Sequence, residues 1–302
     1  MKDGDALALL PAIAASRRKF SELVVDVRPE LHRYASRMTG SVFDGEDVVQ
    51  DALAKAYYAL GEMDEPPSFK PWLFRIVHNA AMDVLRRYDR KNVELFAEVP
   101  ERVSDEEPRV DPELLEAALS VFVELPPVQR SALILKDVLG HSLEEVATTL
   151  ETTVGAVKAA LSRARENVLL SPGEKARAPR PASAEEQINL DRYVALFNDR
   201  NWDGLRALVG SEAQLDLVSR LKKSAADAHY YDHYAAVADA EGLRAERGFV
   251  DGTPAIAIFR PASSPIPAYY VLLGWKDDRV ALIRDFRYVP YIVNGSRFTN
   301  EA

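Results

Sequence analysis

The stretch LPPVQRSALILKDVLGHSLEEVATTLETTVGAVKAALSRARENVL, residues 125–169, indicates how the middle of this chain folds. Apolar residues recur at helical spacing over residues 143–150, which predicts a short amphipathic helix. Ser142 stands directly before this helix and Glu145 follows three residues later, which is the spacing of a capping box. We therefore expect the helix to begin at Ser142.

A second helix is predicted to begin near Val154, after a break at residues 151–153. Its apolar residues Val157, Ala160 and Leu161 would face inward. Two short helices joined by a turn of three or four residues form a helix-turn-helix, whose second helix enters the major groove of DNA. A plain three-helix core that binds nothing is the alternative interpretation of the same pattern.

The whole stretch resembles region 4 of bacterial RNA polymerase sigma factors of group IV, the extracytoplasmic-function (ECF) class. The resemblance implies that the second helix docks on the minus-thirty-five promoter element. It implies seven DNA-facing residues, namely Thr152, Thr153, Val154, Lys158, Ser162, Arg163 and Arg165.

Two positions depart from the family pattern. Glu151 stands where the family usually has glycine at the turn, and Ala159-Ala160 stand where many members carry Ser-Arg. Because arginine is the commonest specific partner of guanine edges, the second departure predicts weakened or altered base reading.

Composition describes a soluble, multidomain protein. The 302 residues suffice for two or three domains, with 47% hydrophobic and 28% charged residues. No apolar run is long enough for a membrane span, and the N-terminal charge order does not fit a secretory signal. The absence of cysteine excludes disulfides and thiolate metal sites and fits a reducing compartment. We therefore expect a cytoplasmic protein with no membrane span.

The net charge of −9 is unusual for a protein that binds nucleic acid. Basic residues nevertheless gather at 17–19, 86–91 and 163–165, whereas acidic residues concentrate over 94–124. Because local charge decides DNA binding, this balance favours one subunit of a larger DNA-binding complex over an independent binder.

Residues 16–92 are predicted to form an all-helical domain. Within it, residues 41–60 and 71–91 carry long amphipathic patterns, and Pro66-Pro67 forbid helix between them. Pro71 is well placed in the first turn of the second helix. Phe69, Trp72 and Phe74 lie close to basic residues in the sequence, so they are either core residues or stacking platforms for unpaired bases.

The phrases FDGEDVVQDALAKAY (43–57) and FKPWLFRIVHNAAMDVLRR (69–87) resemble region 2 of the same sigma factors. The resemblance implies that the first phrase contacts core RNA polymerase through Asp44, Asp47, Gln50 and Asp51. It implies that the second phrase reads the melted minus-ten element through Arg75, His78, Asn79, Arg86 and Arg87. A solvated helix end is the alternative interpretation of Arg86 and Arg87.

Two linkers divide the chain. Residues 93–112 are acidic and proline-dotted, and residues 172–184 are rich in proline, alanine and basic residues. The predicted order is an N-terminal tail (1–15), region 2 (16–92), a linker (93–112), region 4 (113–171), a linker (172–184) and a C-terminal domain (185–302).

The C-terminal domain is predicted to be α+β, because an amphipathic helix pair over residues 188–209 precedes several strand-like runs. Residues 276–279 separate two such runs and predict a hairpin turn. The phrase at 198–203 and the closing Arg-Asp-Phe run resemble the SnoaL-like cone-shaped fold. That resemblance implies a pocket, for which the candidate residues are His229, Tyr231, His233 and Asp285. A surface helix over 229–234, with Asp285 paired to Arg284 or Arg287, is the alternative.

The predicted fold class is therefore multidomain, with two all-α sigma modules, the second a helix-turn-helix, followed by an α+β SnoaL-like domain. The expected function is that of a sigma factor whose C-terminal domain modulates activity, with core RNA polymerase and promoter DNA as partners. We further expect contact between the C-terminal domain and the sigma modules, and a candidate small-molecule ligand. No enzyme activity, catalytic residue, cofactor or metal is expected. The alternative is an independent helix-turn-helix regulator with a ligand-binding or enzymatic C-terminal domain.

Overall fold

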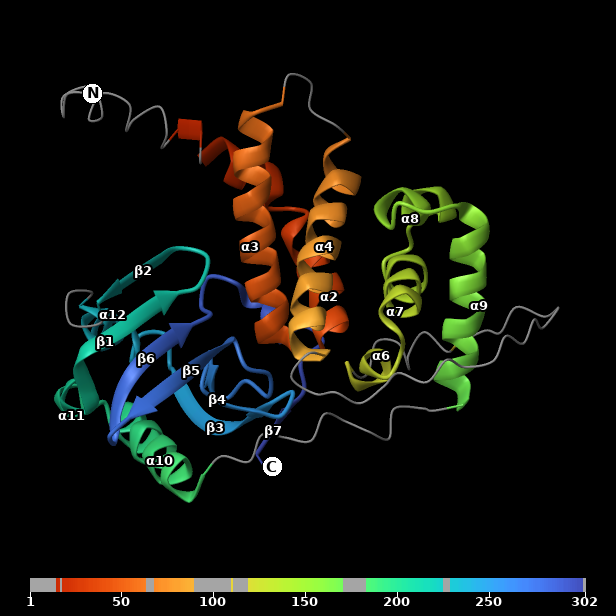
Figure 1. Ribbon diagram of the computed structural model, residues 1–302. Helices are drawn as coiled ribbons and strands as arrows, with labels where there is room; N and C mark the ends of the chain where they lie inside the picture. The colour runs from red at the N-terminus through yellow and green to blue at the C-terminus, as the bar shows by residue number, and fades with distance from the viewer. Residues whose placement is uncertain are drawn as a thin grey trace. The chain divides into compact units, whose positions relative to one another are not determined.

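The computed structural model describes residues 15–16, 18–63, 68–89, 110, 119–170, 183–224 and 229–300. The chain divides into two compact units, residues 1–176 and 177–302 (Figure 1). The predicted N-terminal tail and both linkers lie almost wholly outside the described residues. Within the described parts of the chain, no helix is both long and apolar enough to cross a membrane.

Region 2 consists of three main helices, α2 (Arg28–Thr39), α3 (Val42–Gly61) and α4 (Phe69–Asp89). Figure 1 shows them as a bundle. Ser41 caps α3 by accepting a hydrogen bond from the Asp44 backbone N–H at 3.2 Å. Pro71 lies in the first turn of α4, as the sequence predicts.

Region 4 is built from α6 (Ser120–Val123), α7 (Pro127–Leu133), a π-helical turn (Ile134–Val138), α8 (Leu143–Thr149) and α9 (Val154–Leu170). The predicted capping box is confirmed. Ser142 Oγ accepts from the Glu145 N–H at 3.1 Å, and the Glu145 carboxylate accepts from the Ser142 N–H at 2.7 Å. These hydrogen bonds lower the pKa of Glu145.

The turn between α8 and α9 is a Schellman motif centred on Glu151. The Thr152 N–H bonds to the Ala147 carbonyl at 2.9 Å and the Glu151 N–H to the Thr148 carbonyl at 3.4 Å. This motif needs a left-handed residue, and Glu151 has a φ of 52°. Thr153 then caps α9, because its hydroxyl accepts from the Ala156 N–H at 3.2 Å.

Regions 2 and 4 share one hydrophobic core in this structure. Phe74 of α4, Phe122 of α6 and Leu133 of α7 belong to the same cluster and are all fully buried. At the end of α2, Gly40 adopts a φ of 75°, and a Cβ built there would overlap the Val123 side chain. The two regions are thus packed together, although the sequence pattern predicts separate modules, because each region's apolar face covers the other's.

The C-terminal unit is an α+β domain, as predicted. Its helices are α10 (Ala184–Asn198), α11 (Trp202–Leu208) and α12 (Tyr230–Val237). The strands form one mixed seven-stranded sheet in the order β2-β1-β6-β5-β4-β3-β7, with β1 and β6 parallel. Their bounds are β1 (Val209–Leu217), β2 (Leu221–Ser224), β3 (Arg244–Val250), β4 (Thr253–Phe259), β5 (Tyr269–Lys276), β6 (Arg279–Asp285) and β7 (Phe298–Thr299).

The predicted hairpin turn at residues 276–279 is confirmed between β5 and β6. Asp277 and Asp278 both have positive φ, at 50° and 58°, which matches the type I′ turn that two-residue hairpins favour. At the other end of the sheet, β7 pairs with only Phe249 and Val250 of β3. The Asn198 side chain engages both the N–H and the carbonyl of Ala245 on β3, at 2.9 and 3.0 Å.

Candidate nucleic-acid interface

The start of α9 presents an exposed polar surface. Thr152 and Thr153 in the turn and Lys158 and Arg163 on the helix are exposed, whereas Val154 and Ser162 are half-buried. Because recognition helices contact base edges with their N-terminal side chains, this end of α9 is the best-placed candidate for DNA reading in region 4.

Arg165 is engaged within region 4. Its Nε and Nη2 atoms donate to both carboxylate oxygens of Asp137 at 2.9 and 2.8 Å. The two side chains are only 15% and 17% exposed. A bidentate, mostly buried pair of this kind is among the stronger hydrogen-bonded contacts in proteins, so Arg165 ties α9 to the π-helical turn.

Ala159 is exposed and Ala160 is buried against the core of the helical unit. The position at which many family members carry arginine is therefore turned inward here. An arginine at residue 160 would have to displace core contacts before it reached DNA.

The five candidate residues of α4 do not all share one environment. Asn79, Arg86 and Arg87 are exposed, and Arg86 forms a surface ion pair with Asp83 at 3.2 Å. Arg75 is half-exposed and pairs with Glu151 of region 4 at 3.3 Å. His78 is largely covered by neighbouring helices.

His78 belongs to a polar cluster formed by three helices. The Tyr34 hydroxyl of α2 lies 2.8 Å from His78 Nδ1 and 2.6 Å from Ser131 Oγ of α7. Ser131 Oγ lies 3.2 Å from the same His78 nitrogen. Burial lowers the pKa of His78 to about 4. The sequence pattern gave no sign of Tyr34 or Ser131 in this cluster, because they are 97 residues apart.

The candidate polymerase-facing residues lie along α3. Asp47 and Asp51 are exposed, and Asp44 and Gln50 are half-buried. Gln50 donates to Glu46 at 3.3 Å, and Glu46 is fully buried in an ion pair with Arg28. This buried pair fixes the start of α3 against α2, so Asp47 and Asp51 are displayed on a rigid helix.

In the C-terminal unit, Asp285 is fully buried and surrounded by hydrogen-bond donors. It accepts from the Tyr230 and Tyr234 hydroxyls at 2.7 and 3.0 Å and from Arg287 Nε at 2.9 Å. The predicted pairing of Asp285 with Arg287 is therefore present. Desolvation raises the pKa of both tyrosines well above its usual range, so their hydroxyls stay protonated as donors.

The structure does not bring the four candidate pocket residues together. Tyr231 is buried and donates to Tyr193 at 3.2 Å, whereas His229 and His233 are exposed. The carboxylate beside His229 is Asp232, 2.9 Å away at the surface. α12 turns its tyrosines inward and its histidines outward, and within the described part of the chain no histidine is hydrogen-bonded to Asp285 as an oriented general base.

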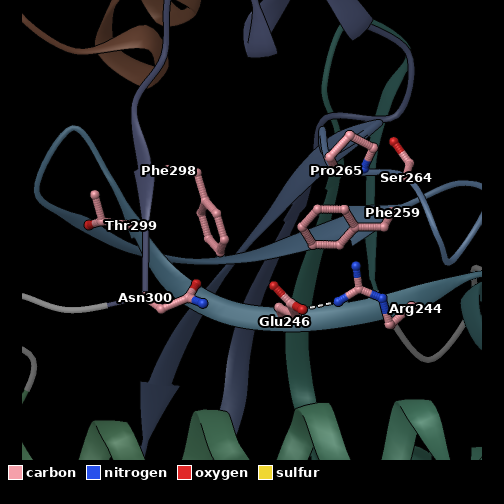
Figure 2. Close-up of a pocket in the computed structure, with 8 residues that line it drawn as sticks. All are labelled: Arg244, Glu246, Phe259, Ser264, Pro265, Phe298, Thr299 and Asn300. Atoms are coloured by element: carbon pink, nitrogen blue, oxygen red, sulfur yellow. Dashed lines mark hydrogen bonds and ion pairs between the residues drawn. The ribbon is translucent and has the colours of Figure 1, made fainter.

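An open pocket of about 650 Å³ lies elsewhere in this unit, between the start of β3, the end of β4 and the C-terminal segment (Figure 2). Phe259 and Phe298 both line it, with their ring centroids 6.3 Å apart in an edge-on contact, and Arg244 packs over the Phe259 ring at 4.1 Å. Arg244 also forms an ion pair with Glu246 on the pocket floor. None of these residues was a sequence-based candidate, because they come from three segments far apart in the chain. The remaining lining residues are Ser264, Pro265, Thr299 and Asn300.

In the described parts of the chain, no group of three or more histidine, cysteine or acidic side chains is placed to hold a metal ion.

Comparison with known proteins assigns both helical regions. Residues 23–91 match the Sigma-70 region 2 family and residues 115–168 match the Sigma-70, region 4 family. The ECF RNA polymerase sigma factor SigG of Mycobacterium tuberculosis (strain ATCC 25618 / H37Rv) is 32% identical over 65% of this chain and 60% of its own length. The match therefore spans about three fifths of that relative.

The ECF RNA polymerase sigma factor SigM of the same strain is 31% identical, over 53% of this chain and 81% of its own length. A solved structure of the Mycobacterium tuberculosis ECF sigma factor SigJ aligns with 88% of this chain and 95% of its own length, at 20% identity and a TM-score of 0.35.

Proposed function

Because this chain belongs to the ECF RNA polymerase sigma factors, we propose that it directs core RNA polymerase to specific promoters for transcription initiation. The proposal rests on one observation, that the chain joins an exposed helix-turn-helix surface to a second helical region with an exposed acidic helix face. A regulator that binds DNA alone has no use for the second region.

We assign the promoter contacts by exposure. The turn residues Thr152 and Thr153, with Lys158 and Arg163 of α9, are proposed to read the minus-thirty-five element. Asn79, Arg86 and Arg87 of α4 are proposed to hold the melted minus-ten strand, where stacking and positive charge bind unpaired bases.

Transcription in vitro tests this function. Core RNA polymerase from the same bacterium would be mixed with a library of genomic fragments, with and without the protein. We expect discrete transcripts only when both are present. Asp47→Arg combined with Asp51→Arg should abolish them, because both positions are proposed to face polymerase. Asp199→Arg combined with Glu212→Arg, exposed in the other unit, is the charge-matched control. Tight, specific DNA binding without polymerase would instead support the independent regulator.

We further propose that the C-terminal unit is a SnoaL-like domain that modulates the sigma regions. Its interior is filled by tyrosine side chains around Asp285 and Arg287, which favours regulation over catalysis. Twelve residues separate Leu170 from Ser183, and so short a tether holds a domain at roughly millimolar effective concentration. Weak contacts with the sigma regions would then suffice.

We propose the pocket lined by Phe259 and Phe298 as the small-molecule site of this domain. The contacting aromatic pair beside a paired guanidinium and carboxylate suits a small amphipathic molecule.

Removal of the C-terminal unit tests the modulating role. The chain truncated after Leu170 keeps the entire core of the helical unit. We expect its transcript yield with core polymerase to differ from that of the full chain at equal concentration. Equal yields over a full titration would refute modulation and leave the sigma function standing.

A further inference from the structure

The pocket of the C-terminal unit contains an arginine that is fixed in place before any ligand arrives (Figure 2). Arg244 Nε donates to the Ala262 carbonyl at 2.7 Å, and Nη1 donates to the Glu246 carboxylate. The guanidinium carbon lies 4.1 Å from the centroid of the Phe259 ring. Because these contacts already order the side chain, a ligand that binds it pays little of the usual cost of ordering an arginine.

The pair of Arg244 and Glu246 keeps unused hydrogen-bonding atoms. Within the described parts of the chain, Arg244 Nη2 has no acceptor, and Glu246 accepts only from Arg244. Both side chains line the pocket, and they are 34% and 37% exposed. Since a guanidinium has several N–H donors and a carboxylate has several acceptor sites, the pair offers a free donor beside a free acceptor.

The loop on the other side of the pocket contributes shape more than polarity. The Ser264 hydroxyl donates to the Ile266 carbonyl at 2.7 Å and accepts from the Ile266 N–H at 3.2 Å. Pro265, the next lining residue, has no backbone N–H. Polar recognition in this pocket therefore falls mainly to Arg244 and Glu246.

Phe298 gives the pocket an aromatic wall. Its half-buried ring contacts Phe259 edge-on at 6.3 Å and stacks on Tyr270 at 6.3 Å. Gly248 lies beneath it, where any Cβ would overlap the ring. These contacts hold the ring in place, and its exposed part lines the pocket. A flat ligand ring can therefore be buried against Phe298.

The segment that carries Phe298 is tied to the sheet. The Tyr270 hydroxyl lies 2.8 Å from Ser296 Oγ. Asp251 accepts from the Arg297 N–H at 3.2 Å, and its own N–H donates to the Arg297 carbonyl at 3.3 Å. β7 then pairs with β3, the strand that carries Arg244 and Glu246. The aromatic wall and the polar pair are thus parts of one connected frame.

The chemistry of this frame indicates the class of ligand. The charges of Arg244 and Glu246 oppose each other, so the pair gives neither an anion nor a cation a strong net attraction. A neutral group with an N–H donor beside an acceptor matches the two unused positions. A lactam edge has this pattern, and in a purine it consists of the O6 acceptor and the N1–H donor. Arginine is the commonest specific partner of guanine O6, and extruded bases are read by their edges while they stack on aromatic side chains.

We propose that this pocket binds a purine with a lactam edge, that is, guanine or hypoxanthine as the base or nucleoside. Arg244 donates to O6, Glu246 accepts from N1–H, and Phe298 stacks on the ring. The inference rests on the proposed small-molecule site of the C-terminal unit and names the class of its ligand. Because the pocket is open, a ribose attached to the base would extend toward solvent.

Calorimetric titration of the full-length protein with nucleosides tests the assignment. We expect guanosine and inosine, which share the lactam edge, to bind at least about tenfold more tightly than 1-methylguanosine, in which a methyl group replaces the N1 hydrogen. This comparison uses the wild-type protein and needs no variant. Equal binding of guanosine and 1-methylguanosine would overturn the lactam assignment.

Glu246→Gln tests the acceptor. The glutamine oxygen is expected to keep the hydrogen bond from Arg244, which turns the amide N–H2 toward the ligand. Guanosine affinity should then fall by at least about tenfold, because two donors would face each other. Arg247→Ala is the matched control, since Arg247 lies on the opposite face of β3 and pairs with Asp191 of α10, so its loss should leave guanosine binding unchanged. Equal guanosine binding by wild type and Glu246→Gln would contradict the proposal.

Phe298→Ala tests the aromatic wall and separates the two levels of the proposal. Loss of the stacking surface should weaken guanosine binding by about 5- to 100-fold. Indole and phenol, flat amphipathic compounds without a lactam edge, are titrated in parallel. If they bind wild type more tightly than folded Phe298→Ala while guanosine shows no binding up to about 1 mM, the lactam assignment falls and the small-molecule site stands. Absence of binding by every probe would overturn both, and the sigma function would still rest on the transcription assay.

Discussion

Glu151 shows how one residue carries both a local cost and a long-range contact. Its φ of 52° is left-handed, a conformation that the Schellman motif after α8 requires. Glycine adopts this conformation without steric penalty, whereas a residue with a side chain does not. The Glu151 carboxylate forms an ion pair with Arg75 of region 2. The side chains are 43% and 65% exposed, so the pair contributes little free energy by itself.

We therefore expect Glu151→Gly to raise the unfolding free energy of the helical unit by about 1 kcal/mol relative to Glu151→Ala. Both changes remove the ion pair, but only glycine relieves the left-handed strain. Urea unfolding of the two variants measures the difference. Equal stability would mean that the turn relaxes in solution.

At the scale of elements, α9 contains basic residues with different tasks. Lys158 is exposed on its outer face, whereas Arg165 is held by Asp137 at 15% exposure. Exposure marks a side chain that is available to phosphate or base, and bidentate pairing marks one that holds the helix in place.

Lys158→Ala should weaken promoter binding by the holoenzyme and reduce the slope of its salt dependence by about 1, with unchanged stability. Arg165→Ala should instead lower the unfolding free energy by about 1–3 kcal/mol, because it leaves the Asp137 carboxylate unpaired. Salt titrations of DNA binding and urea unfolding of both variants separate the two effects. A stability loss from the Lys158 variant would contradict this division.

Much of the fold could be predicted because its signals are local. The capping box at Ser142 and the turn before Arg279 lie within a few residues of the structure they specify. The junction between regions 2 and 4 could not be predicted, since periodicity shows which face of a helix is apolar but not which helix covers it. Arg165 illustrates the same limit, because the family resemblance implied a DNA-facing side chain and only the structure supplies its partner Asp137. In α12, Tyr230 and Tyr234 donate to Asp285 whereas His229 and His233 are exposed, a division that the sequence pattern did not predict.

At the scale of the whole molecule, the burial of histidine side chains makes the unfolding free energy of the helical unit depend on pH. Burial at the junction lowers the pKa of His78 to about 4, below the 6.5 of an unperturbed histidine. A depressed histidine pKa means that the unfolded chain binds the extra proton, so this stability is present above pH 6.5 and is lost as the pH falls toward 4. Burial also lowers the pKa of His32 and His141, with the same sign.

We expect the unfolding free energy of the chain truncated after Leu170 to fall by at least about 1 kcal/mol between pH 7.5 and pH 5.5, from His78 alone. Trp72 is the only tryptophan in that part of the chain and is 5% exposed, so its fluorescence reports the transition during urea unfolding. His78→Gln should flatten the pH dependence. A wild-type curve with no slope in this interval would show that His78 is solvated.

The outer edge of the C-terminal sheet has a consequence for self-association of the protein. The Asn198 side chain hydrogen-bonds to the backbone N–H and carbonyl of Ala245, as a neighbouring strand would, and β7 pairs with Phe249 and Val250. An edge whose backbone is already satisfied gives an incoming extended segment few sites on which to begin pairing. This border of the seven-stranded sheet therefore offers little template for strand addition by a second chain.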